Sequence, residues 1–243
     1  MVRFRSQWLA CGILFLFFSP GYASLDKSEK VKETHPRVPL KTSELFERIS
    51  ESSSQVKDLS AQVNFHLNLS RLGMHFNVGG DFYYKKPDKF KLKLREVPDF
   101  LVSREDNAFR TTNLLASLQK NITQGYDARV VDETSLQGAN CYVIRLIPKT
   151  KESIQKIVLW VNSQNYTMPK VILSFDDGST LVQRKQYIQT DNIYVVQDME
   201  TDIDSPDIQA EIITNFSHYQ INKGIPDTVF DNQKSGSNPI SAF

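Results

Sequence analysis

The chain has 243 residues, with 29 basic and 28 acidic side chains, so its formal net charge is only +1. A nearly balanced charge excludes a general electrostatic attraction to nucleic acid or to an anionic membrane. Cys141 is the only cysteine that follows residues 1–23, so no disulfide can form within that part of the chain. The remaining part, about 220 residues, fits one β-rich domain well and two small domains less well.

Residues 1–23 have the order of a secretory signal peptide. Arg3 and Arg5 precede an apolar run at residues 9–18, and small residues, Gly21 and Ala23, precede a cleavage position before Ser24. A run of about ten residues is half of the ~20 needed to span a bilayer, although a short membrane anchor is the alternative. We therefore expect an exported, soluble, periplasmic protein.

Cys11 does not indicate lipid attachment, because most of the apolar segment follows it. We expect residues 24–40, which are charged and contain two prolines, to form a flexible leader. Residues 233–243 are rich in Gly, Ser, Asn and Pro and predict a disordered tail. A single domain is then expected over residues 41–232.

Two short helices are predicted. Thr42 or Ser43 can cap a helix that continues to about Ser54, with an apolar stripe along one side. Asn113 can cap the second helix, whose apolar side consists of Leu114, Leu115, Leu118 and Ile122.

The other segments alternate apolar and polar residues with period two, which is typical of antiparallel strands with one solvated face. The predicted strands cover 63–69, 74–84, 89–95, 141–148, 154–161, 170–175, 180–190, 193–196 and 208–219. Gly79-Gly80 suggests a bulge or a sharp bend within the second strand. Because the order has no βαβ rhythm, we predict a mainly β (α+β) fold built on one strongly curved antiparallel sheet, or incomplete barrel.

No motif for nucleophilic catalysis, phosphate binding or zinc binding occurs, and we expect neither enzymatic activity nor a cofactor. A hydrolase whose site is assembled from residues distant in sequence is the weaker alternative. His66 and His75 lie on facing hairpin strands, but a solvated outer face is favoured over a metal site. The basic segment from Lys85 to Arg95 is either a solvated or edge-protecting strand, or a docking surface for an acidic partner or anionic headgroups.

Residues 80–90, with the sequence GDFYYKKPDKF, resemble a strand of the bacterial periplasmic lipoprotein carriers, the LolA/LolB-like family. The order of later segments agrees more loosely over residues 42–231, including Met168-Pro169 and the closing residues 225–230. Where the family pattern has an arginine before the proline, this chain has Lys86. Lysine keeps the charge but lacks the planar fork of donors, so the chain resembles a divergent member.

The resemblance implies an incomplete barrel with helices as a lid over an apolar cavity that binds acyl chains. Lys86 would act as the gate residue, and Leu114, Leu115 and Leu118 would lie on the lid. The cavity face would comprise Phe65, Leu67, Phe76, Val78, Phe82, Tyr84, Phe90, Leu92 and Leu94.

The function that the resemblance implies is that of a periplasmic carrier and chaperone, acting as a monomer. It would receive acylated lipoproteins or other lipids from an inner-membrane release complex and pass them to an outer-membrane acceptor. The alternative is a periplasmic regulatory module on the same fold that binds lipid or an acyl signal. A solid core without a cavity is the structural alternative to both.

Overall fold

The computed structural model describes residues 42–87, 89–95, 125–151 and 153–231. The expected signal peptide, leader and tail lie outside these residues, as does the second helix with Leu114, Leu115 and Leu118. No helix among the described residues is long and apolar enough to cross a membrane.

One helix and ten strands make up the described part of the chain. Their bounds are α2 (Thr42–Ser54), β1 (Asp58–Leu69), β2 (Met74–Lys85), β3 (Lys89–Leu94), β4 (Tyr126–Leu136), β5 (Ala139–Pro148), β6 (Ile154–Asn162), β7 (Lys170–Phe175), β8 (Thr180–Thr190), β9 (Ile193–Asp204) and β10 (Gln209–Ile221). Short 3-10 turns lie at Ser70–Leu72 (η1) and Asp227–Val229 (η2).

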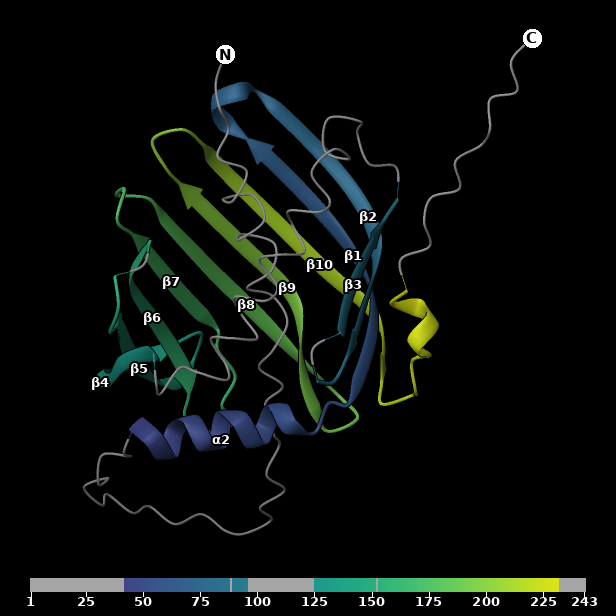
Figure 1. Cartoon of the computed structure of the whole chain (residues 1–243), viewed down its shortest axis with the longest axis horizontal. Helices are drawn as coiled ribbons and strands as arrows, with labels where there is room; N and C mark the ends of the chain where they lie inside the picture. The colour runs from purple at the N-terminus through teal and green to yellow at the C-terminus, as the bar shows by residue number, and fades with distance from the viewer. Residues whose placement is uncertain (1–41, 88, 96–124, 152, 232–243) are drawn as a thin grey trace.

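All ten strands form one antiparallel sheet in the order β3-β2-β1-β10-β9-β8-β7-β6-β5-β4. Within the described residues β3 and β4 each pair on one side only, so the sheet is open rather than a closed barrel. The sheet curves strongly, and α2 crosses the lower ends of the strands in the view of Figure 1. The expected curved antiparallel fold with an N-terminal helix is confirmed.

One face of the sheet, called the inner face below, carries the buried alternate residues of each strand. The apolar stripe of α2 packs against this core through Leu45 and Ile49. Removing these apolar side chains from water supplies the main stabilising free energy, at about 25 cal/mol per Å² of apolar surface. The outer face carries the polar partners of the same alternation, as expected for a one-sided sheet.

The bulge expected at Gly79-Gly80 is absent, because the register between β1 and β2 runs through both residues without a break. Gly80 is needed for a different reason. A Cβ atom there would lie 2.8 Å from the carbonyl oxygen of Lys93 and 3.2 Å from Leu94 Cδ2 on β3. The glycine therefore allows β3 to lie close against β2.

Two differences from the predicted strands have physical causes. β4 was not predicted, because it is an edge strand whose later residues, Asp132 to Ser135, are exposed and give no apolar alternation. β9 continues beyond Val196 to Asp204, with Met199, Thr201 and Ile203 on the inner face. Left-handed residues form the turns on either side of β8, with Gly178 at φ of 84° before it and Asp191 and Asn192 at 51° and 62° after it.

Candidate functional site

The nine residues predicted to line a cavity all lie on the inner face of β1, β2 and β3. The register aligns Ala61, Phe82 and Leu92 in one row across the three strands, and Leu59, Tyr84 and Phe90 in the next. The ring centroids of Tyr84 and Phe90 lie 5.0 Å apart.

Four of the nine are buried, and five are partly buried against the same core. The buried four are Phe65, Val78, Phe82 and Tyr84, and the partly buried five are Leu67, Phe76, Phe90, Leu92 and Leu94. The structure thus places them on one apolar surface, whereas their binding of acyl chains stays a prediction.

Lys86, the predicted gate residue, lies at the end of β2 beside the C-terminal end of α2. Its Nζ donates a hydrogen bond to the backbone carbonyl of Ser54, the last residue of the helix. The last carbonyls of a helix have no partner within the helix and carry partial negative charge, so a cation stabilises them. α2 has no basic residue in its own last turn, and Lys86 supplies one from the sheet. Partial burial lowers the pKa of the Lys86 ammonium.

A second connection ties the same corner to the end of β10. Asn222 Oδ1 accepts a hydrogen bond from the backbone N–H of Lys57 at 2.7 Å, and its Nδ2 donates to the carbonyl of Gln55 at 2.9 Å. Asn222 adopts the left-handed conformation, with φ of 56°. The linker between α2 and β1 is therefore held from both sides, by β2 and by β10.

The basic segment is bound in part by residues 225–231, which follow β10. Lys85 Nζ donates to Asp227 at 2.7 Å and to the carbonyl of Ile225 at 2.8 Å, and Lys89 lies 3.0 Å from Asp227. The hydrogen bond from Lys85, followed by that from Lys89, lowers the pKa of the Asp227 carboxyl. Lys91 donates to the carbonyl of Asp231. These contacts dock residues 225–231 against the sheet, which gives part of the segment an internal role.

The two strand histidines lie on the outer face of the sheet, the position that the sequence favoured for them. His66 and His75 are both exposed on the outer face, and His66 Nδ1 lies 2.7 Å from Asn77 Oδ1. An acidic group on β9 and β10, formed by Glu200, Asp202 and Glu211, has the spacing of a metal site. Arg184 lies 3.2 Å from Glu200 and 2.6 Å from Asp202, so a cation already occupies this position.

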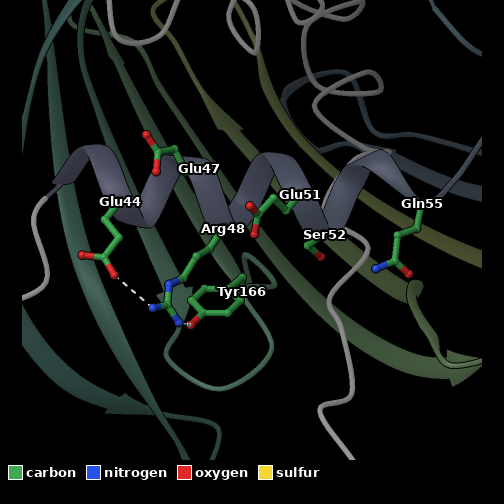
Figure 2. Close-up of a pocket in the computed structure, with 7 residues that line it drawn as sticks. All are labelled: Glu44, Glu47, Arg48, Glu51, Ser52, Gln55 and Tyr166. Carbon is green, nitrogen blue, oxygen red and sulfur yellow. Dashed lines mark hydrogen bonds and ion pairs between the residues drawn. The ribbon is translucent and has the colours of Figure 1, made fainter.

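A pocket of about 510 Å³ lies beside α2. Figure 2 shows Arg48 between Glu44 and the hydroxyl of Tyr166, to which it donates hydrogen bonds of 2.9 and 2.7 Å. The lining is polar, and consists of Glu44, Glu47, Arg48, Glu51, Ser52, Gln55 and Tyr166. Three carboxylates make this pocket unsuitable for an acyl chain.

A polar group in the middle of the inner face was not predicted from the sequence. Gln183, Lys185, Thr201 and Thr214 on β8, β9 and β10 are all buried there among apolar residues. Burial lowers the pKa of Lys185 to about 8. The segment TLVQRKQYIQT has polar residues at both alternating positions, so hydropathy could not show which of them face inward.

A family model with the description "-like: Uncharacterized protein" matches residues 106–234, more than half of the chain. The chain belongs to this family. The matched region contains β4 to β10 in full. A comparison with curated protein sequences found no match.

Solved structures match the fold at low identity. A DUF1329 family protein from Desulfovibrio piger superposes with a TM-score of 0.56 at 15% identity, over 77% of this chain and 95% of that one. A putative outer membrane lipoprotein-sorting protein domain from Vibrio parahaemolyticus gives 0.48 at 13% identity, over 76% and 95%. A LolA superfamily protein from Nitrosomonas europaea gives 0.45 at 12% identity, over 72% and 90%.

Proposed function

We propose that this protein binds acyl chains on the inner face of its sheet and carries acylated lipoproteins through the periplasm, from the inner toward the outer membrane. The observation that carries the proposal is the inner face itself. Its aromatic and aliphatic rows run across β3, β2 and β1 and continue onto β10, through Ile212 and Phe216. An open, curved sheet with one apolar face and a helix across its strand ends suits an elongated apolar ligand.

Burial of an acyl chain on such a face needs no catalytic group. Each methylene removed from water contributes about 0.8 kcal/mol, so burial of ten methylenes provides roughly 8 kcal/mol before the cost of immobilising the chain. A ligand held in this way is released by exposing the face. α2 is the described element that packs against the face from outside the sheet, and Lys86 is one of its links to the sheet.

The proposal includes export, which the order of residues 1–23 supports. The mass of the protein recovered from the periplasm should equal that of a chain that begins at Ser24. A mass that retains residues 1–23 would contradict this part of the proposal without affecting lipid binding.

The test of the binding face compares Phe82→Glu with Tyr83→Glu. Phe82 is 2% exposed on the inner face, whereas its neighbour Tyr83 points to the outer face opposite Ser60 and Lys91. Native mass spectrometry would measure the acylated ligand that copurifies, and thermal unfolding would measure the fold. We expect Phe82→Glu to lose the ligand while a folded population remains, because a buried carboxylate without a partner is costly next to an acyl chain.

Tyr83→Glu should keep the ligand. Equal ligand content in both variants, or loss of ligand only together with the fold, would contradict a binding face and indicate a solid core.

A further inference from the structure

The polar group on the inner face interrupts an otherwise apolar surface. Gln183, Thr201 and Thr214 are fully buried, and Lys185 is 3% exposed. Their nearest neighbours along the rows of the sheet are apolar, namely Val171, Met199, Ile212 and Phe65.

The register brings the four side chains into one patch on three adjacent strands. Gln183 lies opposite Thr201, and its Nε2 is 3.3 Å from Thr201 Oγ1. Lys185 lies opposite Met199, which in turn lies opposite Thr214 on β10. Lys185 and Thr201 are thus diagonal neighbours on one face, at a separation that a long side chain spans.

Two features of this patch match an anion. Lys185 provides an ammonium group with three donors, and hydrogen bonds from a charged donor to an anion are about twice as strong as neutral ones. Thr214 Oγ1 is buried and has no hydrogen-bond partner within the described residues, which leaves its hydroxyl able to donate.

The acids on these strands do not belong to the patch. Glu200, Asp202 and Glu211 alternate onto the outer face, where Arg184 binds the first two. Among the described residues, the inner face therefore combines the buried cation of Lys185 and neutral donors with a wide apolar surface around them. That combination is complementary to an amphiphile that has an anionic group at the end of an acyl chain.

We propose that Lys185, together with Gln183, Thr201 and Thr214, binds the anionic group of an amphiphile, a carboxylate or a phosphate, whose acyl chain lies along the inner face. The part that concerns the chain rests on the proposed function. The anionic group adds a requirement that burial of an acyl chain alone does not impose.

The test compares three probes with the same C16 chain: palmitate, palmitoyl lysophosphatidate and hexadecanol. Their dissociation constants would be measured on the exported, delipidated protein and on Lys185→Met, which removes the charge and keeps the length of the side chain. Lys170→Met is the matched control, because Lys170 is a half-buried lysine on β7 that lies over the ring of Trp160, 4.6 Å from its centroid.

The parent and Lys170→Met should bind at least one anionic probe about tenfold more tightly than hexadecanol, which corresponds to one hydrogen bond from a charged donor. Lys185→Met should lose that preference while its affinity for hexadecanol is unchanged. The anionic probe with the larger loss identifies the group as a carboxylate or a phosphate.

Equal affinities of all three probes for the parent would overturn the anion site and leave the proposed function in place. Absence of binding by any probe would contradict both. If Lys185→Met fails to fold, Thr214→Val removes one donor with little change in volume and should reduce the preference for the anion by a smaller factor. A preference that survives in every folded variant would overturn the proposal.

Discussion

Lys185 gives a prediction about stability that is independent of any ligand. Burial lowers the pKa of its ammonium from 10.5 to about 8 in the folded protein, whereas the unfolded chain keeps the ordinary value. Each pKa unit corresponds to about 1.36 kcal/mol, so the charged lysine destabilises the ligand-free fold by about 3 kcal/mol below pH 8. Replacement by methionine should remove this cost at pH 7.

The sign of the pH dependence follows from the protons bound in each state. Between pH 8 and 10.5 the unfolded chain binds a proton at Lys185 that the folded chain has released. The free energy of unfolding therefore rises with pH across this interval because of Lys185. The gain in the free energy of unfolding of Lys185→Met over the parent is therefore complete at pH 7 and mostly lost by pH 10.

Urea unfolding of the delipidated protein at pH 7 and pH 10 would measure this difference. The tyrosines on the same side of the sheet, Tyr187 and Tyr219, are present in both proteins, so their contributions cancel in the comparison. Lys170→Met, at a half-buried position, should differ little from the parent at either pH. If Lys185→Met is no more stable than the parent at pH 7, or keeps the same advantage at pH 10, the assignment of a costly buried charge is wrong.

Three further substitutions test the contacts around the inner face. Lys86→Leu should lower the free energy of unfolding by about 1 kcal/mol, because it removes a partly exposed charged hydrogen bond to the end of α2. It should also speed amide exchange in α2 and lipid transfer. The control Lys86→Arg should do neither. Gly80→Ala should lower the free energy of unfolding by ~1–3 kcal/mol, because its Cβ meets backbone on β3, whereas Gly79→Ala meets only the side chain of Asn64 and should cost less. Asn222→Gly keeps the left-handed backbone but loses the hydrogen bonds to the α2–β1 linker, and urea unfolding should show a loss of ~1–3 kcal/mol.

Each of these expectations has a result that contradicts it. Parental exchange and transfer rates in Lys86→Leu would remove Lys86 from the gate role. Equal effects at Gly79 and Gly80 would mean that the approach of β3 is not what requires glycine. Parental stability of Asn222→Gly would show that β10 does not hold the linker.

Most of the fold could be predicted because its strands alternate clearly and its turns have strong signals. Asp176 to Ser179 separates β7 from β8, and both strands have the predicted bounds. β4 was not predicted, because an exposed edge strand needs few apolar residues. The continuation of β9 was missed because Val195 and Val196, two adjacent residues, are both buried directly before a register shift between β8 and β9. This break in the alternation hides the rest of the strand.

The placement of the candidate site residues could be predicted only where apolar alternation defines a face of the sheet. Phe65, Phe82 and Leu92 could be assigned to one face from alternation alone, and the structure places them there. The partner of Lys86 could not be named, because Ser54 is 32 residues away and meets it only when α2 packs on the sheet. The burial of Lys185 could not be predicted from the sequence, because a lysine in a strand usually faces water.

Transfer of an acylated lipoprotein between membranes tests the central claim most directly. A fluorescently labelled, triacylated lipopeptide would be placed in donor vesicles, and its arrival in acceptor vesicles would be followed with the exported protein, with Phe82→Glu and with Tyr83→Glu. The proposed function predicts that the parent and Tyr83→Glu accelerate transfer in proportion to their concentration, while folded Phe82→Glu does not. Transfer at the uncatalysed rate with the parent, or equal acceleration by folded Phe82→Glu, would contradict it.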